Sequence, residues 1–259
     1  MIPVTDPDDE RVSDYRTLRG RESRDLLWAE GPTVVRRLLE SEVPPRSVLM
    51  SASMHERLAP LFAAHDMPLF VADDAVIAAI VGFDLNRGVI AVAARPAARP
   101  LHRVIPTAHR LVVLEAVNDA ENLGAIARSV RGLGGDGLII DPTCADPYYR
   151  RSVRVSMGEV LHLPIARAPL DEVFTSLREH DVTVWALTPR RDATSIAELV
   201  HRGVPERLAL VVGAEGPGLS AEVLARHVNV RIPMVADVDS LNVGHAVAAA
   251  LAVVQSSTP

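Results

Sequence analysis

The chain has 259 residues, of which 48% are hydrophobic and 23% charged, so its composition is that of a globular protein and excludes a disordered one. No apolar run approaches the roughly 20 residues of a membrane-spanning helix, and the acidic N-terminus lacks the apolar core of a secretory signal. A single cysteine, Cys144, excludes an internal disulfide framework. These features predict a cytoplasmic protein without a membrane partner.

The charge composition is unusual because all 27 basic residues are arginine, while the formal net charge is −6. The acidic balance argues against a general nucleic-acid-binding surface. Codon bias in a GC-rich genome would account for the absence of lysine. Arginine also binds phosphate through two parallel hydrogen bonds, so a local arginine patch could bind RNA on an acidic protein.

The first half of the chain predicts a small α/β domain behind a polar lead. Residues 1–27 are mostly polar and predict an extension that ends in a short helix. Residues 28–94 alternate between helical and strand patterns, which predicts an α/β substrate-binding domain. Its expected elements are a helix from 32, a strand at 47–50, a helix at 54–64, a strand at 68–71, a helix at 73–80 and a strand at 89–93. Two prolines within residues 95–100 predict a linker, which is expected to cover residues 95–107.

A second alternating series covers residues 108–259. Its expected strands are at 111–114, 138–140, 182–187, 208–212 and 228–232. Its expected helices are at 123–131, 170–180, 220–227 and 243–255. Apolar strands separated by helices predict a parallel sheet that is covered on both faces.

Two glycine-rich segments differ in their structural context. Gly132–Gly137 matches the spacing of a dinucleotide-binding loop, but a helix precedes it and a strand follows, which is the wrong order. It therefore predicts a helix end and a turn. Gly213–Ser220 follows a buried strand and precedes a helix, the position where α/β sheets bind ligands. Taken alone, this segment is equally consistent with a plain turn in which Ser220 caps the next helix.

Two further segments combine polar residues with helix starts. Residues 232–234 end a strand, and Ser240 and Asn242 precede the last helix, where they could simply act as caps.

Asn122 and Arg128 are six positions apart, which is about 240° of helical rotation. Both cannot lie on one helical face, so Asn122 is expected at the helix start.

Together these segments resemble the SpoU/TrmH-type RNA ribose methyltransferases of the SPOUT class. The three motifs, in order, are Asn122-x-Gly-x-x-x-Arg128, Gly213–Ser220, and Ile232-Pro-Met followed by Ser240-Leu-Asn-Val. Arg154-Val-Ser-Met-Gly resembles an intermediate element of the same family, and the match covers about residues 108–255. Residues 28–94 more loosely resemble a ribosomal-protein-like substrate-binding domain, through Glu30-Gly-Pro and Asn86-Arg-Gly-Val.

The resemblance implies an α/β fold with a trefoil knot, a homodimer, and methyl transfer from S-adenosylmethionine to a ribose 2′-hydroxyl of RNA. It assigns Arg128 to activating that hydroxyl. Because arginine is effectively always protonated, we expect Arg128 to stabilise a developing alkoxide or to hold a phosphate. Residues expected to orient the reacting groups are Asn122, Glu215, Ser240 and Asn242. The implied cofactor-binding residues are Leu187, Thr188, Gly213, Glu215, Gly218, Ile232, Ser240, Leu241 and Asn242.

The RNA partner is expected to contact an arginine cluster. Arg150, Arg151 and Arg154 follow two tyrosines that could stack on unpaired bases, although a solvated surface cluster would have the same sequence. The accessory domain favours ribosomal RNA over transfer RNA, and no DNA partner is expected.

Three other functions remain as alternatives at this point. They are a catalytically inactive RNA-binding protein, a nicotinamide oxidoreductase, and a thiol enzyme built on Cys144. The retained motif residues argue against the first, and the misplaced glycines argue against the second. The nine histidines lack the close paired spacing of metal ligands, so no metal is expected.

Overall fold

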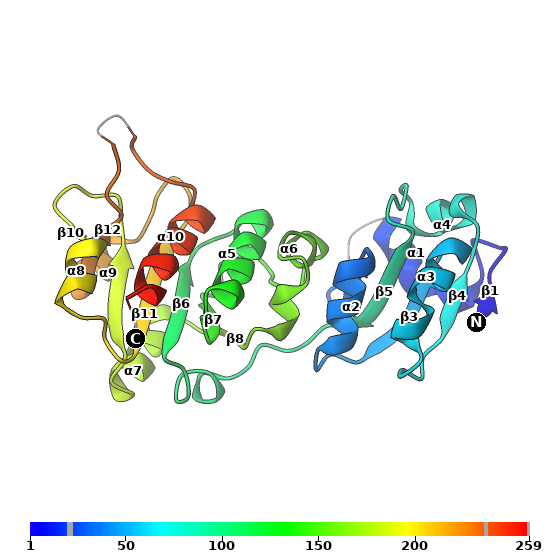
Figure 1. The fold of residues 1–259 in the computed structure, drawn as a ribbon, viewed down its shortest axis with the longest axis horizontal. Helices are drawn as coiled ribbons and strands as arrows, with labels where there is room; N and C mark the ends of the chain where they lie inside the picture. Colours follow the sequence, from blue (N-terminus) through cyan, green and yellow to red (C-terminus); the bar gives the residue numbers. More distant parts are fainter. Residues whose placement is uncertain (20–22, 236–237, 258–259) are drawn as a thin grey trace. The chain divides into compact units, whose positions relative to one another are not determined.

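The computed structural model describes residues 1–19, 23–235 and 238–257. The chain divides into two compact units, each with its own sheet (Figure 1). Unit 1 contains Met1–Pro96 and Tyr148–His162, and unit 2 contains Ala97–Pro147 and Leu163–Pro259.

Unit 1 is a five-stranded mixed sheet in the order β1-β4-β3-β5-β2. Its strands are β1 (Ile2–Pro3), β2 (Leu26–Glu30), β3 (Pro45–Met50), β4 (Leu69–Val71) and β5 (Val89–Ala94). Its helices are α1 (Ser13–Arg16), α2 (Pro32–Glu40), α3 (Ala52–Phe62), α4 (Asp74–Val81) and α6 (Arg150–Val155). The small α/β domain is therefore present, and α2 buries the apolar stripe that its sequence predicts.

The polar extension expected over residues 1–27 is wrong as a separate segment. β1 pairs in parallel with β4, and the side chains of Val12 and Tyr15 are fully buried. The Tyr15 hydroxyl lies 2.8 Å from Ser47 Oγ, and burial raises the pKa of this tyrosine far above its usual value. A few buried apolar residues thus anchor a segment whose average composition is polar.

A second difference is that residues 148–162 belong to unit 1, although their sequence lies between two motifs of the second domain. The Arg37 guanidinium of α2 pairs with Glu159 at 2.6 Å and donates to the Met157 carbonyl oxygen at 2.5 Å. A Cβ on Gly158 would lie 3.1 Å from Arg37 Cβ. These long-range contacts have no local signature in the sequence.

Unit 2 is a seven-stranded, entirely parallel sheet in the order β10-β12-β9-β11-β6-β7-β8, which confirms the predicted fold class. The strands are β6 (Arg110–Glu115), β7 (Gly137–Ile140), β8 (Ile165–Arg167), β9 (Thr183–Leu187), β10 (Thr194–Ser195), β11 (Leu208–Gly213) and β12 (Val228–Arg231). The helices are α5 (Ala120–Gly132), α7 (Leu170–Glu179), α8 (Ile196–Arg202), α9 (Ala221–Arg226) and α10 (Val243–Gln255). The short β8 and β10 and helix α8 were not predicted.

The linker expected over residues 95–107 is wrong in its second half. Val104 and Ile105 are 2% and 0% exposed and belong to the core of unit 2. Prolines flank these residues, but apolar side chains between prolines can still be buried.

The segment Gly132–Gly137 connects the end of α5 to β7 as predicted, which leaves no dinucleotide-binding loop there.

Helix α10 packs against α5 and against β11. A Cβ on Gly244 would lie 3.2 Å from the Ala125 Cβ, so small residues on both helices permit the close approach.

The trefoil knot that the family resemblance implies stays a prediction. No helix among the described residues is long and apolar enough to cross a bilayer.

Candidate functional site

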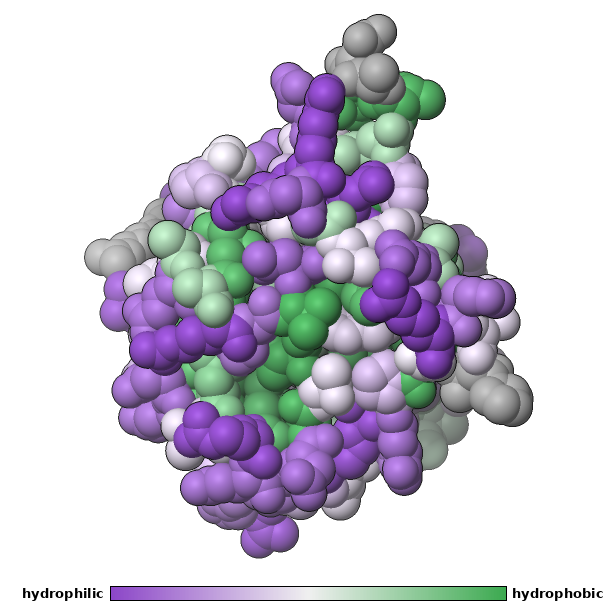
Figure 2. Space-filling model, turned by 90° about the vertical axis from the view of Figure 1, so that its left-hand side faces the viewer, coloured by the Kyte–Doolittle hydropathy of each residue, from purple (hydrophilic) through white to green (hydrophobic). Residues whose placement is uncertain are grey.

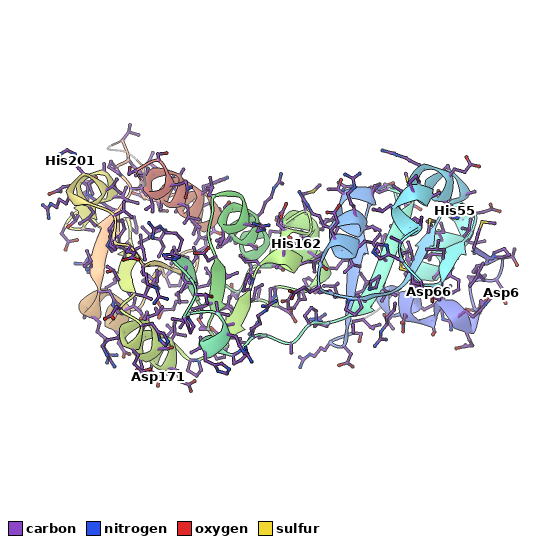
Figure 3. All side chains as sticks on the ribbon, turned by 60° about the horizontal axis from the view of Figure 1, so that its bottom comes forward. Asp6, His55, Asp66, His162, Asp171 and His201 are labelled. Carbon is purple, nitrogen blue, oxygen red and sulfur yellow. The ribbon has the colours of Figure 1, made fainter. Side chains whose placement is uncertain are left out.

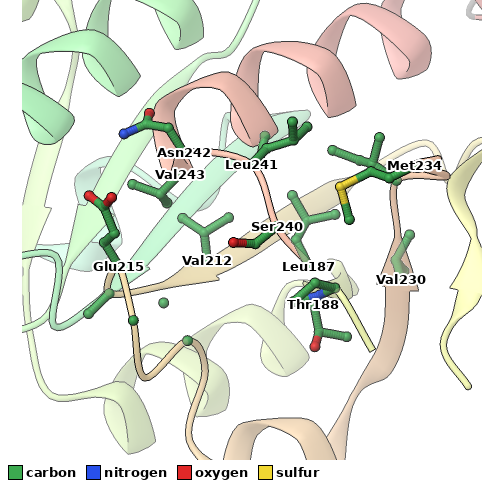
Figure 4. Close-up of a pocket in the computed structure, with 17 residues that line it drawn as sticks. Leu187, Thr188, Val212, Glu215, Val230, Met234, Ser240, Leu241, Asn242 and Val243 are labelled. Carbon is green, nitrogen blue, oxygen red and sulfur yellow. The ribbon is translucent and has the colours of Figure 1, made fainter. Parts of the chain in front are cut away.

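The carboxyl ends of β9, β11 and β12 surround a cavity of about 320 Å³ (Figure 4). Parallel strands bring the loops after these strands to one edge of the sheet, although the loops are far apart in sequence. Every residue that the sequence analysis associated with a cofactor lines this cavity. These residues are Leu187, Thr188, Gly213, Glu215, Gly218, Ile232, Ser240, Leu241 and Asn242.

The cavity has an apolar wall and a polar end. Leu187, Val230 and Met234 supply apolar surface, while Glu215 and Asn242 lie together at one side (Figure 4). Several apolar residues that line the cavity were not predicted from the sequence. They are Pro189, Val212, Val230, Met234, Val243 and Ala246, each within four positions of an expected site residue. An apolar slot with a few convergent polar groups is the usual form of a small-molecule site.

Gly213 is required by the loop that follows it. A Cβ at this position would lie 2.1 Å from the carbonyl carbon and oxygen of Gly218. The loop folds back because Gly218 N donates to the Ala214 carbonyl oxygen at 3.0 Å. A larger residue at Gly213 would therefore clash first with the loop backbone.

A chain of hydrogen bonds joins the three motifs at the polar end of the cavity. Asn122 Nδ2 donates to Glu215 Oε2 at 2.9 Å, and Asn242 Nδ2 donates to Asn122 Oδ1 at 2.7 Å. Asn242 Oδ1 in turn accepts from the backbone N–H groups of Gly244 at 2.9 Å and His245 at 3.4 Å. These polar residues were predicted to orient the reacting groups, but their hydrogen bonds to one another were not predicted.

The ends of this chain determine the orientation of both amides. Backbone N–H groups of α10 can only donate, so Asn242 must present its oxygen to them and its Nδ2 to Asn122. The Glu215 carboxylate can only accept, so Asn122 must present its Nδ2 to it. Asn122 is 8% exposed and Asn242 is the partly buried N-cap of α10, whereas Glu215 at the other end of these hydrogen bonds is exposed to solvent.

Arg128 does not line this cavity. It lies on the exposed face of α5, and it forms no ion pair with the residues that the structure describes. Arg128 and Asn122 are about 240° apart around helix α5, so the two side chains face different directions, and Asn122 faces the side of the cavity.

Ser240 lines the cavity and Asn242 caps α10, so the capping interpretation is correct for Asn242 and wrong for Ser240.

The predicted RNA-binding arginines lie in unit 1. The Arg150 guanidinium stacks on the Phe83 ring at 4.4 Å from its centroid and lies 3.8 Å from a Glu30 oxygen, so it packs within the unit. Arg151 and Arg154 are exposed on α6, and an RNA role for them stays a prediction. Tyr148 is 8% exposed, which contradicts its expected stacking on bases, whereas Tyr149 is 41% exposed.

Cys144 is not placed as a nucleophile. Burial raises the pKa of its thiol to about 11, with a further contribution from the Asp141 charge. The reactive thiolate is therefore scarce at neutral pH.

Within the described ranges, no group of three or more His, Cys, Asp and Glu side chains could hold a metal ion. In Figure 3, for example, His201 and Asp171 of unit 2 lie on separate helices, far from each other.

The surface of unit 2 is not uniformly polar. Figure 2 shows an apolar, hollowed area bordered by hydrophilic side chains. The exposed large apolar residues of this unit are Val228, Val235, Val238 and Leu241. Three of them lie on the segments between β12 and α10, beside the cavity.

Comparison with known proteins identifies the family. Residues 109–252, more than half of the chain, match the model of the SpoU rRNA methylase family. The chain belongs to the SpoU rRNA methylase family. An uncharacterized tRNA/rRNA methyltransferase from Mycobacterium tuberculosis is 43% identical, over 96% of this chain and 89% of its own length. The SpoU assignment makes the chain an S-adenosylmethionine-dependent RNA methyltransferase, so the nicotinamide and thiol alternatives are wrong.

Two other similar proteins match nearly the whole chain. A 23S rRNA (guanosine(2553)-2'-O)-methyltransferase from Bacillus subtilis is 24% identical, over 98% of both chains. The crystal structure of an AdoMet-bound rRNA methyltransferase from Sinorhizobium meliloti matches with a TM-score of 0.82 and 25% identity. It covers 98% of this chain and 97% of that chain, so the similarity includes unit 1.

Proposed function

We propose that this SpoU protein methylates a ribose 2′-hydroxyl in ribosomal RNA. The observation that carries the proposal is the hydrogen-bonded chain Glu215–Asn122–Asn242 at the polar end of an apolar cavity. The ribosomal, 2′-O-specific activity named for the Bacillus subtilis relative, which matches over both units, supports the choice of substrate. Transfer RNA is the alternative substrate.

The residues of the cavity fit S-adenosylmethionine. The apolar wall formed by Leu187, Ile232 and Leu241 suits an adenine ring, and the absence of a side chain at Gly213 keeps the loop backbone close to the cavity. When bound, the cofactor supplies an electrophilic methyl group on a sulfonium sulfur. The protein must then align the hydroxyl, exclude water and accept its proton.

Glu215 is suited to receive that hydroxyl. Its Oε2 accepts from Asn122, and its Oε1 accepts no hydrogen bond from a described residue. We expect Oε1 to accept a hydrogen bond from the ribose hydroxyl, while Asn122 and Asn242 hold the carboxylate in place. A fixed carboxylate aligns the hydroxyl without reorganisation during the reaction.

Arg128 is expected to act on the RNA, because its side chain lies outside the cavity. Its charge would stabilise the developing alkoxide or the phosphate beside it. Arg128→Ala should therefore lower the rate of single-turnover methylation at saturating RNA by about 100- to 1000-fold. Removal of one hydrogen-bond donor that stabilises a developing negative charge has an effect of this size in other enzymes. Arg131→Ala, an exposed residue three positions later on α5, is the matched control and should retain the wild-type rate.

The assay uses deproteinised ribosomal RNA and transfer RNA as separate substrates, with labelled S-adenosylmethionine. Resistance of the labelled nucleotide to alkaline cleavage reports methylation at the 2′-oxygen. No transfer to either RNA by the wild-type chain would favour a catalytically inactive RNA-binding protein. A normal rate for Arg128→Ala at saturating RNA, with weaker RNA binding, would make Arg128 only a phosphate contact.

We also propose a homodimer formed through α10. Apart from His245, residues 243–255 carry no ionisable side chain, and Ala248, Ala249 and Val253 are partly exposed. Light scattering should give twice the 27.9 kDa mass of the chain at micromolar concentration. Ala249→Arg should yield monomers, while Ala197→Arg on the exposed face of α8 should not. A monomeric wild-type chain would refute the proposal.

A further inference from the structure

The turn between β6 and α5 has an unusual backbone conformation. It begins at Ala116, directly after β6, and it leads to Asn122 at the start of α5. Ala116 has a φ of 54°, which lies in the left-handed region that residues other than glycine seldom adopt. Alanine has no polar side chain that could stabilise this conformation from within the turn. Other parts of the fold must therefore hold it.

A buried carboxylate from the neighbouring strand contacts this turn. Asp141 directly follows β7, which pairs with β6, and it is 6% exposed. Its Oδ2 accepts a hydrogen bond from the backbone N–H of Ala116. Its Oδ1 accepts from the backbone N–H of Thr143 and from the Thr143 hydroxyl, the latter at 2.6 Å. The Asp141 N–H donates to the Leu114 carbonyl oxygen at 3.1 Å, so Asp141 is bonded to β6 as well as to the turn.

These contacts require a carboxylate at position 141. Burial raises the pKa of Asp141, but the hydrogen bonds from Thr143 and from the Ala116 N–H outweigh it, so the pKa lies below its usual value. The ionised group can only accept hydrogen bonds, and each of its oxygens meets one backbone N–H. An asparagine side chain has a single oxygen, so it could satisfy one of these N–H groups and would point its own donors at the other.

The path from the turn to Asn122 is short. Asp119, three residues after Ala116, is the N-cap of α5, and its Oδ1 accepts from the Asn122 backbone N–H at 2.8 Å. Asn122 Nδ2 then donates to Glu215 Oε2 at 2.9 Å. A displaced turn would carry the cap and the first residues of α5 with it, because they follow it directly in the chain.

The loop that carries Glu215 is attached to β6 before the turn begins. Gly213 pairs with Glu115, the last residue of β6, and Glu115 Oε2 accepts from the Ser220 N–H at 2.8 Å. Both ends of this loop are therefore fixed to β6 and not to Ala116. A change at Ala116 would consequently move Asn122 relative to Glu215, which stays with the strand.

We propose that Asp141 is a positioning residue for methyl transfer, which holds Ala116 in the left-handed conformation and thereby places Asn122 beside Glu215. The inference rests on the proposed function, in which Asn122 holds the Glu215 carboxylate for the ribose hydroxyl. Asp141 itself does not line the cofactor cavity, so it acts only through the turn and α5.

The first test is Asp141→Asn in the full chain. Methyl transfer to deproteinised ribosomal RNA is measured with labelled S-adenosylmethionine at varied concentrations of both. We expect kcat to fall by about 10- to 100-fold, since small displacements of reacting groups have effects of this size. The KM values for RNA and for S-adenosylmethionine should stay near those of wild type, because neither binding surface is changed.

A second substitution distinguishes positioning from a general loss of folding. Glycine adopts positive φ angles without support, so Ala116→Gly alone should leave kcat near the wild-type value. In the double variant Asp141→Asn/Ala116→Gly, the turn no longer depends on the carboxylate, and most of the lost rate should return. A residue with a merely structural role would not be rescued by a glycine in this turn.

Asp136→Ala is the control for lost stability. Asp136 lies at the other end of β6, where its Oδ2 accepts from the backbone N–H groups of His109 at 2.7 Å and Arg110 at 2.8 Å. The variant therefore removes two hydrogen bonds to the backbone beside the same strand, at the opposite edge of the sheet from the cavity. It should lower the thermal unfolding midpoint while kcat stays near the wild-type value.

Amide hydrogen exchange over residues 117–123 gives a readout that does not need activity. Exchange should be faster in Asp141→Asn than in wild type, and it should slow again in the double variant. A wild-type kcat for Asp141→Asn would overturn the proposal, and so would a lowered kcat that Ala116→Gly fails to restore.

The proposed function and this inference fail in different ways. If the wild-type chain methylated no ribosomal RNA, the proposed function would fail, and exchange would decide the role of Asp141. Faster exchange that the double variant reverses would support Asp141 as the residue that places Asn122. Exchange equal to that of wild type would overturn it.

Discussion

Asn122→Asp is expected to make methyl transfer strongly dependent on pH. The new carboxyl would face Glu215 Oε2 at the 2.9 Å contact that the Asn122 amide now makes. Two carboxylates at that distance cannot both ionise easily, so the pKa of the pair rises. In the protonated form the new carboxyl can donate to Glu215 and accept from Asn242, which reproduces both native hydrogen bonds.

The sign of the effect follows from this geometry. The active arrangement contains the shared proton, so it is populated below the raised pKa of the pair and is lost as pH rises through it. We expect about 100-fold slower single-turnover methylation than wild type near pH 8, the size of effect that misplacement of reacting groups produces. Relative to wild type at the same pH, most of this loss should disappear near pH 5.5.

Asn122→Ala is the control for this experiment. It removes both hydrogen bonds and cannot carry the shared proton, so its loss of activity should be similar at every pH. RNA and S-adenosylmethionine are kept saturating so that only the chemical step is compared. A wild-type rate for Asn122→Asp near pH 8 would show that the Glu215–Asn122–Asn242 chain does not position the reaction.

Gly213→Ala should weaken S-adenosylmethionine binding by about 10- to 100-fold. The added Cβ would lie 2.1 Å from the Gly218 carbonyl group, so the loop over residues 214–218 must move away from the cavity. Overpacking of this kind costs about 1–3 kcal/mol, and the affinity loss is that cost expressed as a ratio. Calorimetry on the folded variant measures it directly.

Gly132→Ala provides a matched glycine substitution. A Cβ at Gly132 would meet no atom within 4 Å, and its backbone conformation needs no special freedom. Its affinity for S-adenosylmethionine should equal that of wild type. If Gly213→Ala bound the cofactor as tightly as Gly132→Ala, the loop would tolerate the displacement and would not define the binding site.

Elements with a strong local signal in the sequence were predicted correctly. The buried strands β6, β7, β9 and β11 are continuous apolar runs, and the sequence located them within a residue or two. Helix α10 has the predicted bounds, because Asn242 caps it and no proline or glycine interrupts its later turns. The two-residue strand β10 lacks such a signal, since pairing with β12 alone makes it a strand.

Segments that depend on remote partners were predicted poorly. Residues 1–19 look polar on average, yet Val12 and Tyr15 bury completely in unit 1. Residues 148–162 lie between motifs of one domain, yet Arg37 and Glu159 join them to the other unit. Whether such a segment is buried depends on a few apolar side chains that pack against residues distant in sequence. The average composition of the segment does not reveal these side chains.

For the site, the sequence by itself determined which residues gather, because motif order and strand polarity place the three loops at one edge of a parallel sheet. It did not determine which side chains touch. Asn122 and Glu215 are 93 positions apart and Asn122 and Asn242 are 120 apart, so only the tertiary packing of α5 beside α10 and the loop after β11 brings them within hydrogen-bond distance. The same packing turns Arg128 away from the cavity, since a residue about 240° further around a helix must face elsewhere.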